Sequence, residues 1–323
     1  MQRCAATILG LLFGTLCALA PAAAQEWPNK TVRIIVPFGA GSTPDVVARL
    51  VADGLQKETG QAFIVENKPG ASGNTGTEAV AKAAPDGGTI GLSIGGPLAI
   101  NTLLFAHLPY DPKKDLSFIT MLVTQPSALA VNASLNVNSV AELVDLLRKN
   151  PGKYNFGSIG VGSLSHLAME AVALKSGTKL VHVPYASSPQ AVTALMRNEV
   201  QMVCLPAISI TPQLGSGAVK MLAISTAQRS VLLPGVPTLK ESGIDVEADA
   251  WNGLIAPAGL PDATIERINH LVREAITSPT VRQKLSAQLM EPIPNSPAEF
   301  RARIDAEIAR WRPVIDAAGI RLE

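Results

Sequence analysis

The sequence predicts an α/β fold with two lobes. Short apolar runs alternate with amphipathic stretches along the chain, a pattern typical of helices packed on mostly parallel sheets. A strand, a glycine-containing loop and a helix follow one another twice, at 31–57 and at 154–175. Because one such module occurs in each half of the chain, we expect two lobes that face each other. A hydrophobic content of 47% is enough for a large core.

The periodicity of apolar residues predicts each element in turn. Strands are expected where short apolar runs end at turn residues, and helices where apolar residues recur on one face. In the first half, the expected strands are 31–36, 62–66 and 89–94, and the helices are 45–57 and 76–83. In the second half, the expected strands are 154–158, 180–183, 200–205 and 219–224, and the helices are 164–175 and 189–197.

The last third of the sequence adds helices. One is expected at 265–276, where four apolar residues share a face. Another should begin at Ser296, because Ser296 and Glu299 form a capping box with proline at the first helical position. Its apolar residues run from Phe300 to Trp311, and we expect them to pack onto the first lobe.

The N-terminus has the features of an export signal. Arg3 precedes an apolar stretch at 8–20, which is too short to span a bilayer, and three alanines end at Ala24. We expect cleavage near Ala24 rather than a membrane anchor. The whole chain has 27 basic and 26 acidic residues. Loss of Arg3 would leave 26 of each, which argues against a nucleic-acid partner.

Cleavage would also leave Cys204 as the one cysteine of the mature chain. No internal disulfide or cysteine metal site is then possible, and Cys204 is expected to be a small core residue. The four histidines show no metal-binding spacing, so neither a metal nor a cofactor is expected.

The first glycine loop, in "VPFGAGSTPDVVARL", has the features of an anion site. Gly39 and Gly41 allow backbone N–H groups to turn inward, Thr43 can cap the helix, and Asp45 falls in its first turn. The loop holds no lysine or arginine and lacks a Walker ending, so any anion would be held by dipoles. The alternative is an ordinary connection between a strand and a capped helix.

The second loop, 160–165, resembles a dinucleotide fingerprint. Ser165 replaces the third glycine, and no acidic residue follows at 180–185, so a nicotinamide cofactor is not expected. Ser163 and Ser165 can instead cap the helix and offer hydroxyl groups to a bound oxygen atom. His166 could touch a ligand or have a structural role.

An exported esterase is the enzymatic alternative. Residues 91–95 match the Gly-X-Ser-X-Gly pattern of a nucleophile elbow, with Ser93 as the nucleophile. However, Ser93 falls inside the expected strand, whereas the turn would be made by Gly95, Gly96 and Pro97. The sequence therefore favours a binding protein over an enzyme.

Several stretches resemble the Bug/TctC family, the extracytoplasmic solute receptors of tripartite tricarboxylate transporters. They are "WPNKTVRIIVPFGAGSTPDVVARL", "VENKPGASGNTGTEAVAKAAPDG", "LPYDPKKDLSFIT", "GSIGVGSLSHLAME", "HVPY", "LLPGVPTLKESG" and "WNGLIAPAG". The resemblance covers nearly the whole mature chain.

The resemblance implies a periplasmic type II binding-protein fold. Lobe 1 would comprise 25–125 and 248–323, lobe 2 would comprise 126–247, and the lobes would be joined near 123–131 and 247–254. A small organic carboxylate would be held between the two glycine loops. The partner would be a membrane transporter, or a signalling protein if the receptor serves as a sensor.

Three departures from the family pattern bear on the ligand. The first loop reads Gly-Ser-Thr-Pro-Asp from Gly41, Ala186 and Ser187 replace a usual lysine and glycine, and Leu205 replaces a common aspartate. A less polar pocket favours an apolar or aromatic monocarboxylate over an amino acid. The expected ligand-binding residues are Phe38, Gly39, Gly41, Ser42, Thr43, Asp45, Ser93, Gly96, Gly162, Ser163, Ser165, His166, Tyr185, Leu205 and Trp251.

Overall fold

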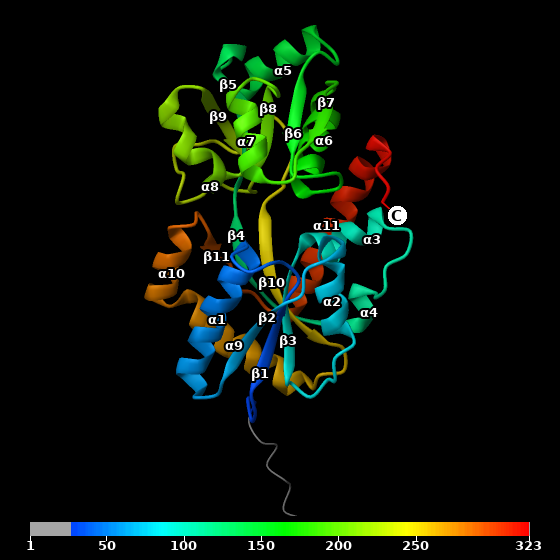
Figure 1. Cartoon of the computed structure of the whole chain (residues 1–323), viewed down its shortest axis with the longest axis vertical. Helices are drawn as coiled ribbons and strands as arrows, with labels where there is room; N and C mark the ends of the chain where they lie inside the picture. Colours follow the sequence, from blue (N-terminus) through cyan, green and yellow to red (C-terminus); the bar gives the residue numbers. More distant parts are fainter. Residues whose placement is uncertain (1–26, 323) are drawn as a thin grey trace, which may run out of the picture.

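The computed structural model describes residues 27–322 and has two lobes, each built around one sheet (Figure 1). The expected export signal, 1–24, lies outside the described residues. The sheet of lobe 1 has the order β11-β4-β10-β3-β1-β2, and that of lobe 2 has the order β7-β6-β8-β5-β9. The strands of lobe 1 are β1 (Val32–Val36), β2 (Phe63–Asn67), β3 (Thr89–Ile94), β4 (Leu116–Gln125), β10 (Ala250–Pro257) and β11 (Glu291–Pro292). Those of lobe 2 are β5 (Ser127–Asn132), β6 (Asn155–Ser158), β7 (Val181–Pro184), β8 (Met202–Pro206) and β9 (Val219–Ile224).

Both sheets are mixed, and the antiparallel strands include β5 and β10, which follow the two crossings between the lobes, as well as the short strand β11. β1 pairs in parallel with β2 and β3, and β6 pairs in parallel with β7 and β8. β10 runs antiparallel to β3 and β4, and β5 runs antiparallel to β8 and β9. Only Pro126 separates β4 from β5, so the chain enters lobe 2 directly from one sheet into the other. It returns along β10, which Figure 1 shows beside β4 between the lobes.

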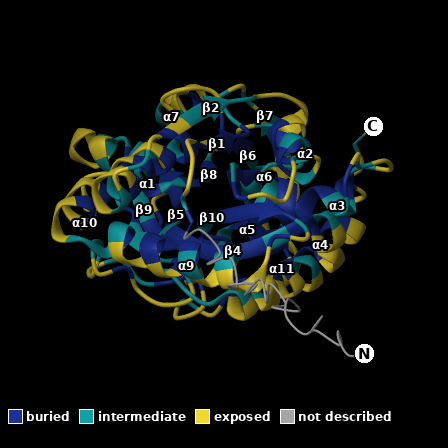
Figure 2. Cartoon of the chain, turned by 90° about the horizontal axis from the view of Figure 1, so that it is seen from below, coloured by how far each residue is buried: buried dark blue, intermediate teal, exposed yellow. Residues whose placement is uncertain are grey.

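Helices cover both sheets, and the strands lie in the interior (Figure 2). Lobe 1 carries α1 (Thr43–Thr59), α2 (Asn74–Ala81), α3 (Asn101–Leu104), α4 (Pro112–Asp115), α9 (Asp262–Thr277) and α10 (Pro279–Ser286). Lobe 2 carries α5 (Val140–Lys149), α6 (Leu164–Ser176), α7 (Ser188–Met196) and α8 (Ala207–Ile210). The apolar stripes of α1 and α6 are buried, as the sequence predicts. No helix of the described part is both long and apolar enough to cross a membrane.

The long helix α11 (Pro297–Ala318) belongs to both lobes. It begins with the predicted capping box: Ser296 Oγ accepts from the Glu299 N–H at 3.2 Å, and the Glu299 carboxylate accepts from the Ser296 N–H at 2.8 Å. Phe300 packs into the core of lobe 1, but Trp311 packs into the core of lobe 2. The expectation that Trp311 lies on the first lobe was therefore wrong. A helix of 22 residues is about 33 Å long, so residues toward its two ends can pack into different lobes.

Candidate functional site

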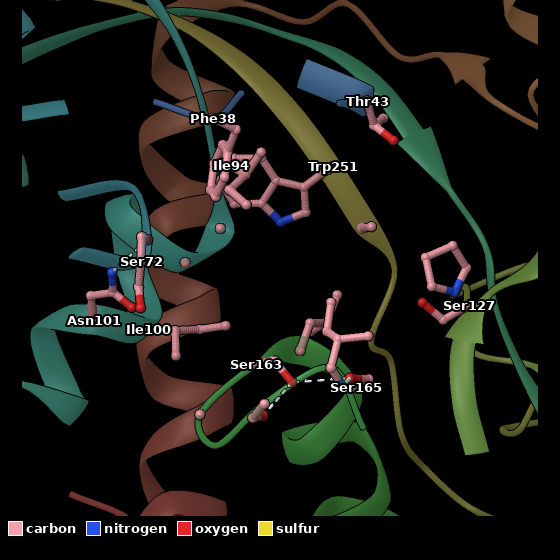
Figure 3. A pocket seen from close by; sticks show the side chains of 18 of the residues that line it. Phe38, Thr43, Ser72, Ile94, Ile100, Asn101, Ser127, Ser163, Ser165 and Trp251 are labelled. Carbon is pink, nitrogen blue, oxygen red and sulfur yellow. Dashed lines mark hydrogen bonds between the residues drawn. The ribbon is translucent and has the colours of Figure 1, made fainter. Parts of the chain in front are cut away.

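A cavity of about 510 Å³ lies between the lobes, and residues from both lobes line it (Figure 3). Seven of the sequence-predicted ligand residues are in its wall: Phe38, Thr43, Gly96, Gly162, Ser163, Ser165 and Trp251. The other eight are not among its lining residues: Gly39, Gly41, Ser42, Asp45, Ser93, His166, Tyr185 and Leu205. The structure therefore brings the starts of both glycine-loop helices to one cavity, and it assigns many of the remaining residues to supporting contacts.

Asp45 fixes the first loop through hydrogen bonds and does not line the cavity. Its carboxylate accepts from the Gly41 N–H at 2.9 Å, from Arg49 at 2.9 and 3.0 Å, and from the Asn67 side chain at 2.9 Å. Burial alone would raise the pKa of Asp45, but the hydrogen bonds from Arg49, Gly41 and Asn67 outweigh it and lower the pKa. With its oxygen atoms engaged in this way, Asp45 shapes the loop.

The first turn of α1 offers polar groups to the cavity. The helix begins at Thr43 with Ser42 as its N-cap, one residue earlier than the sequence suggests for the cap. The Ser42 hydroxyl makes no capping bond; it is buried and has no hydrogen-bond partner in the described part of the chain. Thr43 lines the cavity, and the first N–H groups of a helix lack intrahelical acceptors. A helix start of this kind offers N–H dipoles that suit an anion.

The glycine N–H groups of the second loop donate to side chains of the protein. The Gly162 N–H donates to His166 Nδ1 at 3.1 Å, and the Gly160 N–H donates to Ser158 Oγ at 3.1 Å. The Ile159 N–H donates to Ser165 Oγ at 3.0 Å. Gly160 and Gly162 line the cavity, but their N–H groups hold the shape of the loop. From this side the cavity is lined by loop residues 159–162 and by the start of α6, residues 163–165.

The start of α6, like that of α1, offers polar groups to the cavity. Its N-cap is Ser163, whose hydroxyl accepts from the His166 N–H at 3.3 Å and donates to the Gly160 carbonyl at 2.7 Å. Ser165 Oγ lies 3.0 Å from Ser163 Oγ, as Figure 3 shows. The predicted cap is confirmed. The two hydroxyl groups and the first helical N–H groups together form the second polar patch of the cavity.

Two stacked histidines support the second loop. His166 and His182 lie with ring centroids 3.7 Å apart, and the Phe156 ring packs beside both, with its centroid 4.9 Å from His182 and 5.9 Å from His166. His182 Nε2 lies 2.6 Å from Ser158 Oγ, the group that also holds Gly160. Burial, followed by the neighbouring His166, lowers the pKa of His182 to about 4. Of the two roles open to His166, the structure shows the structural one.

The floor of the cavity carries an ion-pair network that sequence reasoning missed. Arg303 donates to Glu247, Asp249 and Glu307, each at 2.8 Å. Arg310 and the Trp311 indole N–H also donate to Glu307, at 2.9 and 2.6 Å. Asp249 and Glu307 line the cavity and lie at the junction of the lobes. Glu307 lies three or four residues from Arg303 and Arg310 on the same helix, but Glu247 and Asp249 lie more than fifty residues from Arg303, so no local pattern indicates these two partners.

The described residues that line the cavity include no lysine, arginine or histidine. Apolar side chains supply much of the wall, among them Phe38, Ile94, Ile100 and Trp251, which Figure 3 shows around one end. A negative group would therefore depend on helix starts and hydroxyl groups rather than on a cation. The rest of the ligand would meet apolar surface.

A family model described as the tripartite tricarboxylate transporter family receptor matches residues 47–320. The chain belongs to this receptor family. It is 33% identical to protein BugT of Bordetella pertussis over 318 residues, which cover 98% of each chain. Among solved structures, R. palustris Rpa4515 with adipate matches with a TM-score of 0.78 and 33% identity, covering 92% of this chain and 99% of that one. MatC (Rpa3494) from Rhodopseudomonas palustris with bound malate matches with a TM-score of 0.73 and 29% identity, covering 90% and 100%.

Membership in a family of substrate-binding receptors agrees with the environment of Ser93. Ser93 is fully buried inside β3, and its Oγ lies 3.0 Å from Thr77 Oγ1. The sharp turn that an elbow nucleophile needs is absent there, because Ser93 pairs with Gly253 in the sheet. This receptor is therefore not an esterase acting through Ser93.

Two further residues of this receptor differ from expectation. Leu205 is buried in the apolar core beside α7, while its neighbours Cys204 and Pro206 line the cavity. Tyr185 is partly buried in the same core. The strand alternates its side chains, so residue 205 faces away from the cavity when residues 204 and 206 face it. Burial raises the pKa of Cys204 to about 12, which keeps this thiol protonated and unreactive.

Proposed function

We propose that this receptor captures a small organic carboxylate between its lobes and delivers it to a membrane transporter of the tripartite tricarboxylate type. The observation that carries the proposal is the convergence of two helix starts, at Thr43 and at Ser163, on one cavity that contains no cationic side chain in its described lining. Each start provides N–H groups and hydroxyl groups suited to one carboxylate. The adipate-bound and malate-bound neighbours support the same ligand class.

The proposed place of action is the periplasm, and the proposed lobes are 25–125 with 248–323, and 126–247. Ligand would favour the closed state because its carboxylate contacts both lobes only when they approach. Within the carboxylate class, an apolar or aromatic monocarboxylate suits the cavity best. Phe38, Ile94 and Trp251 offer apolar surface to the body of such a ligand.

Thermal unfolding in the presence of matched ligands tests the proposal. A ligand that binds only the folded state raises the melting temperature by mass action. We expect carboxylates to raise it and their primary amides and alcohols to leave it unchanged. Thr43→Val and Ser165→Ala should each weaken the effect, because each removes one hydroxyl group from a helix start. Equal shifts for acids and amides would contradict a carboxylate site.

The partner is tested separately, by crosslinking the ligand-loaded receptor to membranes that contain the transporter. Recovery of the transporter subunits with the loaded receptor would support delivery. Recovery of a sensor protein in their place would assign the same site to signalling.

A further inference from the structure

The cavity has a third polar region, apart from the two helix starts. Ser72 and Asn101 lie side by side there, next to Ile94 and Ile100, whereas Thr43 lies on the opposite side of the view in Figure 3. We name this region the Ser72–Asn101 corner. Neither residue belongs to the first or the second glycine loop, and neither has a part in the proposed carboxylate site.

The orientation of the Asn101 amide is fixed by its neighbours. Its Nδ2 donates to Asn74 Oδ1 at 2.6 Å and to the Ser72 carbonyl oxygen at 3.3 Å. A carbonyl oxygen can only accept, so the nitrogen of Asn101 must face Ser72 and its oxygen must point elsewhere. Asn101 is 3% exposed, and no hydrogen bond from the described residues reaches its Oδ1.

A buried polar chain holds Asn101 in this position. The Tyr110 hydroxyl lies 3.1 Å from Asn74 Oδ1 and 2.9 Å from the Pro97 carbonyl oxygen. Asn74 and Tyr110 are 3% and 5% exposed, so little solvent reaches the chain. Burial raises the pKa of Tyr110, which therefore remains a donor. A rigid support of this kind presents the Asn101 oxygen at a defined place.

The backbone beside Asn101 is strained. Gly70, Ala71, Ser72 and Gly73 all have positive φ angles, of 142°, 45°, 55° and 90°. For Ala71 and Ser72 this left-handed conformation is unfavourable and needs support from the surroundings. The bond from Asn101 to the Ser72 carbonyl supplies part of that support. The result is that the Ser72 hydroxyl is placed at the cavity wall.

We propose that the Ser72–Asn101 corner is a second recognition subsite, which takes a hydroxyl group at the end of the ligand remote from the carboxylate. This proposal rests on the proposed function. Asn101 Oδ1 accepts the proton of that hydroxyl group, and the Ser72 hydroxyl donates to its oxygen. A ligand that displaces solvent from this oxygen atom without supplying a donor leaves the acceptor unpaired, which is costly, so a ligand that supplies the donor is preferred. A second carboxylate would place negative oxygen atoms against Asn101 Oδ1.

Isothermal titration with three acids of equal chain length tests this subsite. Hexanoate, 6-hydroxyhexanoate and adipate differ only at the end remote from one carboxylate, and the same trio is compared at shorter and longer lengths. At the length that fits, we expect the hydroxy acid to bind about tenfold more tightly than the unsubstituted acid, with the dicarboxylate weakest.

Asn101→Leu should abolish the preference for the hydroxy acid while binding of the unsubstituted acid persists. Asn269→Leu is the matched control, because Asn269 is also buried and donates to two carbonyl oxygens, but lies outside the cavity. It should keep the preference. If Asn101→Leu fails to fold, Ser72→Ala provides the test, since alanine tolerates the local φ as poorly as serine does. We expect it to reduce the preference about threefold.

The outcomes separate the two proposals. If no acid of any length binds the unaltered protein, the proposed carboxylate function fails. If hexanoate and its hydroxy counterpart bind equally at every length, the corner is not a subsite, although the carboxylate function stands. A preference that survives in Asn101→Leu, or unchanged in Ser72→Ala, would likewise overturn the assignment.

Discussion

The imidazole rings of His166 and His182 stack with centroids 3.7 Å apart and planes only 11° from parallel. Each ring holds one glycine of the second loop, His166 directly at Gly162 and His182 through Ser158 at Gly160. Glu170 Oε1 lies 3.5 Å from His166 Nε2. Burial, followed by the neighbouring His166, disfavours the charged form of His182 and lowers its pKa.

The stability of the protein should therefore fall as the pH falls from about 6.5 to about 4. The pKa of His182 is lowered from 6.5 to about 4 in the folded protein, by burial and by His166. Between these values the unfolded chain binds a proton that the folded chain does not, and so acid favours unfolding. Urea denaturation across this range measures the effect. His182→Gln should reduce the slope, whereas His270→Gln, on an exposed histidine, should not. An unchanged slope in His182→Gln would refute this cause.

Gly162→Ala should weaken both folding and ligand binding. Gly162 has a φ of 74°, and an added Cβ would lie 2.7 Å from Leu104 Cδ1. The left-handed conformation alone costs an L-residue about 1–2 kcal/mol. Gly39→Ala is the control, because Gly39 has open space around it and no positive φ. Its effect should stay within about 0.5 kcal/mol. Thermal unfolding and titration report both quantities, and equal behaviour of the two variants would contradict the role of the Gly162 backbone.

Arg303→Met should be strongly destabilising. Arg303 is the shared partner of Glu247, Asp249 and Glu307, and the side chains of Asp249 and Glu307 are 8% and 4% exposed. Without the guanidinium group, buried carboxylates lose their main counter-charge, which costs about 3–5 kcal/mol. Chemical denaturation measures this loss. Arg312→Met, on an exposed face of the same helix, should change the free energy of unfolding by less than about 0.5 kcal/mol. A small effect of Arg303→Met would mean that the network contributes little to the free energy of unfolding.

Asp45→Asn should loosen the first loop. The carboxylate of Asp45 receives the Gly41 N–H and the Arg49 guanidinium, and a neutral amide cannot accept both as strongly. We expect a loss of about 1–3 kcal/mol in stability, together with weaker ligand binding. The pKa of Asp45 is lowered in the folded state, so its contribution is present above the unfolded value and disappears as the pH falls through the folded value. Asp53→Asn on the same helix is the matched control, and identical losses would argue against a special role for Asp45.

The sequence predicts the local elements well, because their signals are local. The strand expected at 89–94 matches β3, and the helix expected at 164–175 is one residue shorter than α6. The capping box at Ser296 is also present. The sequence does not predict strands at 116–132 and 250–257, because a strand buried on both faces has no alternation that distinguishes it from other apolar segments. Their antiparallel pairing joins residues more than a hundred positions apart.

The candidate site was predicted in outline but not in its contacts. Both helix starts are visible in the sequence as glycines and hydroxyl residues before an apolar helical face. The acceptor of the Gly162 N–H is not visible in the sequence, because either solvent or His166 could accept this hydrogen bond. The Ser72–Asn101 corner depends on the contact between Asn101 and Asn74, and the floor of the cavity depends on the contacts of Arg303. Both sets of contacts form only when the chain folds.

The helix α11 has a consequence for how the molecule comes apart. Phe300 at one end completes the interior of lobe 1, and Trp311 nearer the other end completes the interior of lobe 2. If α11 detaches, neither lobe keeps an intact hydrophobic core. Heat or denaturant should therefore melt the whole protein in a single cooperative step, with coincident transitions whether the observed probe sits in one half or in the other.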